Sequence, residues 1–397
     1  MNRRQAIALA AAGLCRSARA ANATRLSLIR TRMEEAVARR AMPGAVTLVA
    51  HEGKVVHHEA VGFQDLDKKT PMRKDTIFQI MSMTKPVTGT AVMMLAEEGK
   101  LALTDTVAQH LPEFRGQMMI AARGEEGTMT LKKPARPITI RDLMTHTSGH
   151  PEYPPEGVSF LNGQSGRTLA DVVLACSQMP LLFEPGTKWQ YSNPGIATLG
   201  RIVELRSGMP FEKFLEERLF TPLAMSDTFF FPPESKYGRI ADVQLAGPAI
   251  TTNMDPAYWK FRKGWKYPMP EGGLFSTAAD LANFYQMFLN GGVLNGKRYL
   301  SKASVEVMTK WHNPGMTPAA HNPGQGYGLS WAVVKEPLGE LLLNAQGAYA
   351  HGGAFGTLGM VDPKRQAVYV FLVQRIGGQA DTGRAAFLEI ANAALTE

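Results

Sequence analysis

Segments patterned as β-strands stand at the two ends of this 397-residue chain, and helix-like segments fill most of the stretch between them. Near the N-terminus, residues 45–50 and 54–62 are strand-like runs around a Gly-containing turn, which predicts a β-hairpin. Near the C-terminus, residues 356–361 and 367–374 form a second pair of this kind. The simplest architecture that satisfies both ends is one antiparallel sheet to which each end of the chain contributes strands.

Helical patterns complete this fold. A stripe of apolar residues over 24–41 and an Ala-rich segment over 382–395 predict helices that flank the sheet. The sequence therefore predicts an α+β fold, in which 24–75 and 325–397 form the sheet domain and 76–324 form a large, mostly helical inserted domain. The cleft between the two domains is the expected place for a functional site. Helices inside the insertion are predicted over 86–98, 140–144, 169–177, 195–206, 211–219 and 278–290.

The segment Ser82-Met83-Thr84-Lys85 carries the first chemical signal. A serine followed three residues later by a lysine places both side chains on one face of a helix, one turn apart. A serine hydroxyl is a weak nucleophile until a neighbouring group takes its proton. The segment follows an extended run and precedes Pro86, which suits the first turn of a helix. Because Ser-x-x-Lys occurs about once by chance in a chain of this length, the context carries the hypothesis that Ser82 transfers acyl groups.

A second signal is Tyr191-Ser192-Asn193, which lies in a loop before a predicted helix because Pro-Gly and Asn-Pro pairs surround it. A phenol placed beside cationic amines can have a lowered pKa and act as a base. The Asn193 amide can orient Lys85 or a substrate carbonyl. The alternative is a buried aromatic side chain with a polar tip in a turn.

The third signal is His351-Gly352-Gly353-Ala354, at the edge of a predicted strand. Glycines at such a position allow the backbone of a ligand to approach closely. A free N–H at Ala354 could pair with the N–H of Ser82 as an oxyanion hole. The alternative is a bulge that carries a solvated histidine.

In this order and context, the three motifs resemble the serine β-lactamase and penicillin-binding-protein superfamily. The chain is most similar to class C β-lactamases and to the family VIII carboxylesterases of the same fold, over residues of about 25 to 375. The resemblance implies a β-lactamase/DD-peptidase-like fold, with Ser82 as nucleophile, Lys85 as its partner, Tyr191 as general base and Asn193 as a supporting amide. Further segments that resemble the superfamily are Leu143-Met144-Thr145-His146-Thr147-Ser148-Gly149, Phe183-Glu184-Pro185-Gly186 and Gly272-Gly273-Leu274-Phe275-Ser276-Thr277.

One departure from the superfamily pattern bears on the substrate. Where β-lactamases usually have Lys-Thr-Gly, this chain has His351-Gly352-Gly353. The lysine and threonine help to hold the carboxylate of the drug, whereas histidine is mostly uncharged near neutral pH and glycine has no hydroxyl. A neutral ester does not need that anchor, so the resemblance implies a serine carboxylesterase, with Asn193, His351, Gly352 and Gly353 around the substrate. The chain contains no Gly-x-Ser-x-Gly, which argues against an α/β-hydrolase.

Three other functions stay open at this stage. The chain could be a class C-like β-lactamase or D-alanyl peptidase acting on cell-wall peptides. It could be an acyltransferase that passes the acyl group to an alcohol or amine. It could also be a sensor that becomes acylated at Ser82 and never turns over, although the complete set of Ser82, Lys85 and Tyr191 argues against this.

The N-terminus has the pattern of a secretory leader. Arg3 and Arg4 precede an apolar run, and Ala18-Arg19-Ala20 offers a cleavage site, with Ala21-Asn22-Ala23 as a second option. The paired arginines are typical of twin-arginine export. We therefore expect residues 1–20 to be a signal peptide and the protein to be periplasmic or secreted. The alternative is a frayed Ala-rich helix on a cytoplasmic protein.

Charge and hydropathy exclude other classes of function. The formal net charge is +8, and removing the leader with its four arginines leaves about +4. Because no cluster of basic residues with interleaved aromatics occurs, we expect no nucleic-acid partner. No apolar run approaches 20 residues, so we expect no transmembrane helix and no membrane partner. The expected partner is a small-molecule ester, and the sequence leaves the oligomeric state open.

The remaining candidate residues are less informative. Cys176 lies in an apolar run and is expected to be a small buried residue. No metal motif occurs, and no metal or organic cofactor is expected. His51, His57 and His58 are expected to be solvated histidines on the hairpin, a metal site being the alternative. Finally, an aromatic group could either wall the substrate pocket or anchor a loop, and its members are Tyr258, Trp259, Trp265 and Tyr267.

Overall fold

The computed structural model describes residues 21–155, 166–245, 256–376 and 382–395. The predicted leader, residues 1–20, lies outside the described residues. Within the described part of the chain, no helix is long and apolar enough to cross a membrane.

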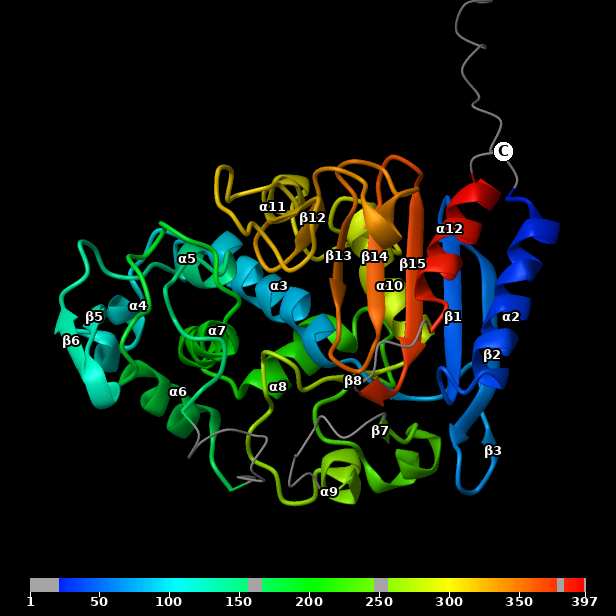
Figure 1. Cartoon of the computed structure of the whole chain (residues 1–397), viewed down its shortest axis with the longest axis horizontal. Helices are drawn as coiled ribbons and strands as arrows, with labels where there is room; N and C mark the ends of the chain where they lie inside the picture. Colours follow the sequence, from blue (N-terminus) through cyan, green and yellow to red (C-terminus); the bar gives the residue numbers. More distant parts are fainter. Residues whose placement is uncertain (1–20, 156–165, 246–255, 377–381, 396–397) are drawn as a thin grey trace, which may run out of the picture.

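An eight-stranded antiparallel sheet forms the centre of one half of the molecule (Figure 1). The two chain ends meet where the first strand pairs with the last long one, with Ala45 opposite Val373 and His51 opposite Ala367. The prediction of one antiparallel sheet built from both ends is therefore confirmed. In spatial order the strands are β11 (Gln325–Tyr327), β12 (Ala332–Val334), β13 (Tyr349–Gly352), β14 (Leu358–Asp362), β15 (Ala367–Val373), β1 (Gly44–His51), β2 (Lys54–Asp65) and β3 (Thr70–Pro71).

Helices cover both faces of this sheet. On one face, α2 (Ala23–Ala38) and α12 (Arg384–Leu395) pack against each other and against β1. On the other face, α10 (Ala278–Leu289) packs against β14, β15 and β1. Because both faces are covered, β15 is buried along its whole length, and its alternate residues enter two different hydrophobic clusters.

A second half of the molecule is mostly helical (Figure 1). Its centre is α7 (Asn193–Ser207), which contacts α3 (Thr84–Glu97), α5 (Ile140–Met144), α6 (Leu169–Ser177) and α8 (Phe211–Leu215). The starts of these helices follow from local sequence. Thr168 and Asp171 form a capping box at α6, Thr139 and Asp142 form one at α5, and the Ser192 side chain accepts the N–H of Gly195 at α7.

Some boundaries differ from those predicted. The segment 211–219 was expected to be one helix, but α8 ends at Leu215 and a π-helical turn, η6 (Glu216–Phe220), follows. The inserted region also contains small strands, and its helix α10 packs on the sheet. The remaining elements are β4 (Phe78–Gln79), η1 (Met81–Met83), α4 (Val107–His110), η2 (Pro112–Phe114), β5 (Met119–Arg123), η3 (Glu125–Gly127), β6 (Met129–Lys132), η7 (Glu234–Arg239), β7 (Gln244–Leu245), α9 (Pro256–Phe261), β8 (Phe275–Ser276), β9 (Val293–Leu294), β10 (Lys297–Arg298), α11 (Lys302–Met308), η8 (Gly339–Leu341) and β16 (Arg375–Ile376).

Candidate active site

Ser82 and Lys85 lie side by side at the start of α3. Ser82 is in the short turn η1, and Lys85 follows in the first turn of the helix, where it is fully buried. The Nζ atom of Lys85 is 3.0 Å from Oγ of Ser82, and it donates hydrogen bonds to Oδ1 of Asn193 at 2.8 Å and to the backbone carbonyl of Glu271 at 2.6 Å. Burial lowers the pKa of Lys85 because desolvation disfavours the charged form, while the carboxylates of Glu271 and Glu152 act in the opposite direction.

The turn that presents Ser82 is strained and fastened. Met81 has a φ of 50°, which is the left-handed region that non-glycine residues rarely adopt. Such a conformation costs about 1–3 kcal/mol and persists only where surrounding contacts impose it. Here the hydroxyl of Thr84 donates to the carbonyl of Met81 at 2.7 Å and accepts the N–H of Leu274 at 3.1 Å. These bonds tie the turn to the segment before β8, and Ser82 is held in place.

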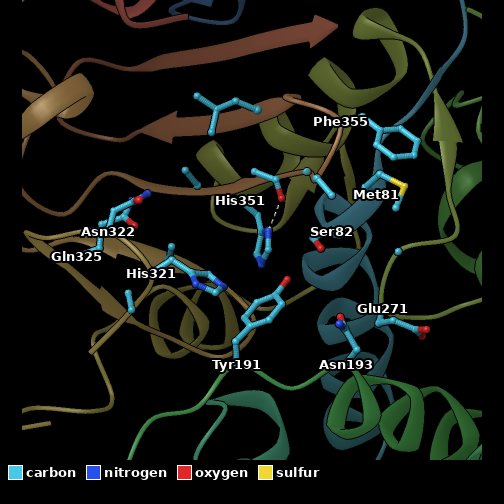
Figure 2. A pocket seen from close by; sticks show the side chains of 18 of the residues that line it. Met81, Ser82, Tyr191, Asn193, Glu271, His321, Asn322, Gln325, His351 and Phe355 are labelled. Atoms are coloured by element: carbon cyan, nitrogen blue, oxygen red, sulfur yellow. Dashed lines mark hydrogen bonds between the residues drawn. The ribbon is translucent and has the colours of Figure 1, made fainter. Parts of the chain in front are cut away.

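Tyr191 approaches the same point from the loop before α7, and its hydroxyl points toward Ser82 and His351 (Figure 2). The centre of its ring is 4.6 Å from Nζ of Lys85. Burial raises the pKa of Tyr191 above its ordinary value, and an interaction with the Ser82 hydroxyl opposes only part of this effect. The sequence by itself suggested a lowered pKa for this phenol. The structure gives the opposite direction, because the phenol is desolvated and Lys85 is the one amine beside it among the described residues.

The third motif closes the site from the sheet side. His351 and Gly352 end β13, and Gly353 and Ala354 form the following turn. A Cβ atom at Gly353 would lie 2.3 Å from the carbonyl oxygen of Ile80, so only glycine fits there. The close approach that the glycine permits is thus to the protein's own backbone just before Ser82. Ala354 and Ser82 both line the cavity, and their role as an oxyanion hole stays a prediction.

His351 is not the solvated histidine considered as an alternative, because its side chain is buried. Its Nδ1 atom lies 2.8 Å from the carbonyl oxygen of Gly352, and its Nε2 atom lies 3.1 Å from the hydroxyl of Tyr327. Burial lowers the pKa of His351 to about 3, and the neighbouring Lys85 adds to the shift. The side chain is therefore uncharged at neutral pH, as the sequence analysis expected from the residue type.

A cavity of about 490 Å³ opens over these groups, and Figure 2 shows part of its lining. Phe355 and Met81 stand on one side of Ser82, and His321 stacks on Tyr191 with 4.4 Å between ring centres. Among the described residues of the lining, the single cation is Arg384, and it forms a salt bridge of 2.9 Å with Glu340.

Two further carboxylates line the cavity. Glu152 forms no ion pair within the described ranges, and its backbone carbonyl accepts the N–H of Asn193 at 3.0 Å. Glu271 is buried and accepts the Tyr267 hydroxyl at both carboxylate oxygens, at 2.8 and 2.9 Å. Sequence reasoning assigned no role to Glu152, Glu271, His321 or Tyr327. They come from loops and short strands that carry no chemical pattern of their own.

The structure divides the aromatic group of the sequence analysis. Trp259 lines the cavity. Trp265 packs edge-on against the Trp259 ring with 5.4 Å between ring centres, and the Tyr267 hydroxyl donates a hydrogen bond to Glu271. The side chain of Tyr258 lies outside the described residues. Both proposed uses, a pocket wall and a loop anchor, are therefore present in different members of the group.

The other candidate residues lie away from this site. Cys176 is buried in α6, as expected, and burial raises the pKa of its thiol to about 12. The expectation of solvated hairpin histidines was wrong for His51 and His57, which are buried; Nε2 of His57 lies 2.8 Å from the Thr47 hydroxyl. Within the part of the chain that the structure describes, no group of three or more His, Cys, Asp or Glu side chains could hold a metal ion.

The profile of the family described as Beta-lactamase matches residues 29–393. The chain belongs to the beta-lactamase family. Protein Rv1367c of Mycobacterium tuberculosis is 32% identical to it, over 84% of this chain and 86% of that protein. Esterase EstB of Burkholderia gladioli is 28% identical, over 83% of this chain and 85% of its own length.

Solved structures of this beta-lactamase fold agree with the architecture. EstCE1, described as a hydrolase with promiscuous acyltransferase activity, superposes with a TM-score of 0.79. It shares 24% identity and covers 94% of this chain and 99% of its own, so the likeness shows the fold. The predicted superfamily and the predicted fold class are confirmed, and the chain stands among serine hydrolases that include the esterase EstB.

Proposed function

We propose that this protein is a serine carboxylesterase that cleaves uncharged esters through an acyl-Ser82 intermediate. The observation that carries the proposal is the buried, uncharged His351, which stands where β-lactamases have a lysine. A charge-assisted hydrogen bond to a substrate carboxylate contributes about 1.5–3 kcal/mol, and this motif offers none. The esterase EstB, similar over most of the chain, supports the same substrate class.

The contacts of Lys85 indicate how Ser82 loses its proton. A neutral amine has two N–H bonds and one lone pair. Asn193 Oδ1 and the Glu271 carbonyl can only accept, so they take the two hydrogens and leave the lone pair facing the Ser82 hydroxyl. Because burial lowers the pKa of Lys85, this neutral form is populated at a lower pH than for an exposed lysine.

The reaction then follows two steps. Ser82 Oγ attacks the ester carbonyl while Lys85 takes its proton, and the N–H groups of Ser82 and Ala354 hold the oxyanion. Tyr191, whose raised pKa keeps it protonated, gives its proton to the departing alkoxide and recovers one from Lys85. Water attacks the acyl-enzyme in the reverse proton sequence and releases the acid. This assignment makes Lys85 the first base and Tyr191 the proton relay, whereas the family resemblance by itself implied Tyr191 as the base.

Acyl transfer to an alcohol or amine is the second candidate function. It uses the same acyl-Ser82 species, with a second molecule in place of water at the last step. EstCE1, which has the same fold and is described as having promiscuous acyltransferase activity, is the specific observation that favours it. Adding a primary alcohol to the ester assay and measuring the ratio of new ester to acid distinguishes the two.

The first test compares a neutral p-nitrophenyl butyrate with a chromogenic cephalosporin, using the purified chain without residues 1–20. We expect fast turnover of the ester, slow turnover of the cephalosporin, and a loss of about three orders of magnitude or more in kcat for Ser82→Ala. The matched control is Ser27→Ala, on the exposed face of α2, which should keep full activity. Faster turnover of the cephalosporin would refute the esterase assignment, and stoichiometric labelling of Ser82 without product would identify an acylation sensor.

A further inference from the structure

A chain of four hydrogen bonds runs through buried side chains beside the catalytic groups. The backbone N–H of Ser192 donates to Nδ1 of His146 at 3.2 Å, and Nε2 of His146 lies 3.1 Å from the hydroxyl oxygen of Tyr327. The same oxygen lies 3.1 Å from Nε2 of His351, and Nδ1 of His351 lies 2.8 Å from the Gly352 carbonyl. The chain therefore starts at the residue after Tyr191 and ends two residues before Ala354.

The two ends of this chain fix the position of every proton in it. An N–H can only donate, so Nδ1 of His146 is an acceptor and the neutral ring carries its hydrogen on Nε2. A carbonyl can only accept, so Nδ1 of His351 carries the hydrogen and its Nε2 atom is an acceptor. Tyr327 then accepts from His146 and donates to His351. The assignments made from the two ends agree at the Tyr327 hydroxyl, and every bond has one donor and one acceptor.

Burial makes this pattern rigid. His146, Tyr327 and His351 are all buried, so losing a hydrogen bond here costs more than losing one at an exposed site. Burial lowers the pKa of His146 well below its ordinary value and that of His351 to about 3. A proton added to Nε2 of His351 would meet the Tyr327 O–H donor, so the hydrogen-bond geometry also favours the neutral ring.

This chain of hydrogen bonds connects the two sides of the cleft. His146 belongs to the segment after α5 in the helical half, whereas Tyr327 ends β11 and His351 lies on β13 in the sheet. The His146 ring also packs on the Tyr191 ring with 4.6 Å between centres. Figure 2 shows the His351 ring above Tyr191, with its bond to the Gly352 carbonyl dashed.

We propose that His146 and Tyr327 are positioning residues for acyl transfer at Ser82. They hold His351 in one tautomer and one orientation, and through its bond to Gly352 they fix the turn that presents the Ala354 N–H, while the other end of the chain fixes the loop of Tyr191. The kinetic consequence rests on the proposed function, whereas the tautomers follow from the hydrogen bonds alone.

The tautomers are measured first, on the unmodified full-length protein with 15N-labelled histidine. Long-range 1H–15N correlation spectra distinguish protonated from unprotonated ring nitrogens. We expect His146 as the Nε2–H form and His351 as the Nδ1–H form, both unchanged between about pH 5 and pH 8, where an ordinary histidine titrates. His351→Asn and the resonances that move in Tyr327→Phe assign the two signals. The same tautomer in both histidines, or titration of either ring near pH 6.5, would overturn the proposal.

Other groups that face the two rings affect their titration and are part of the expectation. Lys85 and His321 lie near both histidines and lower the pKa of each by charge repulsion when protonated, and the Glu152 carboxylate raises the pKa of His321 itself. Tyr191 packs on both rings. Lys85→Met therefore should leave the two tautomers as they are, because it removes a charge and no bond of the chain.

Tyr327→Phe tests the positioning role. It removes one hydroxyl and leaves the two Nε2 atoms without partners, so we expect kcat for the ester to fall about tenfold to a hundredfold with KM changed less than twofold. The acid limb of kcat, which Lys85 sets, should also become steeper, because Nε2 of His351 loses the O–H donor that opposes a second protonation.

The matched control is Tyr369→Phe. It removes another buried tyrosine hydroxyl, whose bond of 2.9 Å to Asn392 joins β15 to α12 on the far side of the sheet. If Tyr327→Phe lowered only the melting temperature, as Tyr369→Phe should, and left kcat and its pH profile intact, the role would be structural and the proposal would be wrong. A wild-type protein with the expected tautomers but no esterase activity would instead count against the proposed function.

Discussion

The Nζ atom of Lys85 lies 3.0 Å from Oγ of Ser82 and is held there by two acceptors, the Asn193 amide oxygen and the Glu271 carbonyl. This arrangement directs the Lys85 amine at the Ser82 hydroxyl, which the common Ser-x-x-Lys spacing alone does not do. The helix gives the spacing, but the acceptors determine which way the lone pair of the amine faces.

The pH profile of the ester reaction should report the charge of Lys85. The neutral amine is the active form, so kcat/KM should rise with pH through the lowered pKa of Lys85 and become flat above it. Between that pKa and the ordinary value of 10.5, the unfolded chain binds more protons than the native one, so the free energy of unfolding should also rise with pH. Steady-state rates from about pH 5 to about pH 9 check this. A rate that is still increasing at the upper end would contradict a lowered pKa.

Glu271→Gln should move this acid limb to lower pH. The Glu271 carboxylate stabilises the protonated amine and so raises the pKa of Lys85, and a neutral amide removes that effect. Glutamine keeps an acceptor for the Tyr267 hydroxyl and leaves the backbone carbonyl that binds Lys85 in place. The comparison variant is Glu98→Gln, whose exposed ion pair with Arg218 lies outside the cavity lining. An unmoved limb would show that the carboxylate does not influence the lysine.

Gly353→Ala should destabilise the protein and lower its activity. The added methyl carbon would lie 2.3 Å from the Ile80 carbonyl and 2.2 Å from the Thr357 hydroxyl, so the turn before Ala354 must shift. Forcing an extra carbon into a packed site costs about 1–3 kcal/mol. At Gly352 the nearest such atom is 3.5 Å away, so the same change there should lower the melting temperature less. Equal losses at both positions, measured by thermal unfolding and ester turnover, would exclude this steric explanation.

Glu152 should disfavour anionic substrates. Its carboxylate lines the cavity and forms no ion pair among the described residues, so it repels a second negative charge. Mono-p-nitrophenyl succinate should therefore be a poorer substrate than neutral p-nitrophenyl butyrate. Glu152→Gln should raise kcat/KM for the succinate relative to kcat/KM for the butyrate about two- to fivefold, as expected for a half-exposed charge. Added salt should reduce this effect. An unchanged ratio would remove Glu152 from substrate selection.

If the leader is removed, cleavage should follow Ala20 rather than Ala23. Oδ1 of Asn22 accepts the N–H of Arg25 at 2.9 Å as the cap of α2, and the N–H of Asn22 donates to the Ala394 carbonyl at 3.0 Å. Cleavage after Ala23 would remove this cap, which contributes about 0.5–2 kcal/mol. Mass spectrometry of the protein exported by a bacterial host gives the mature N-terminus. A start at residue 24 would contradict the prediction.

The sequence specified the sheet because its information is local and repeated. Strand-like runs at the two ends predict one sheet, and helix caps such as Thr139 with Asp142 mark where helices begin. The small strands of the inserted region, among them the pair β5 and β6, were not predicted, because exposed short strands carry no alternation of apolar and polar residues. The helical stretch predicted over 211–219 is present, but its second half is π-helical, a change of hydrogen-bond pattern for which the sequence carried no signal.

The residues of the candidate site also fall into two groups, those that local sequence indicated and those that it did not. Ser82, Lys85 and Tyr191 were found from short motifs, because their spacing or turn context is written in consecutive residues. Tyr327 has no such signal, and His146 stood in a motif whose use was unknown. Their roles depend on which buried polar atom faces which, and that is decided when distant segments meet.

By itself, the sequence determined the fold class, the candidate nucleophile and the absence of the usual lysine from the third motif, because these depend on residue identity and local order. Only the tertiary structure decided the directions of the Lys85 and Tyr191 pKa shifts and the tautomer of His351. Each of these depends on desolvation and on hydrogen-bond partners contributed by segments far apart in the chain.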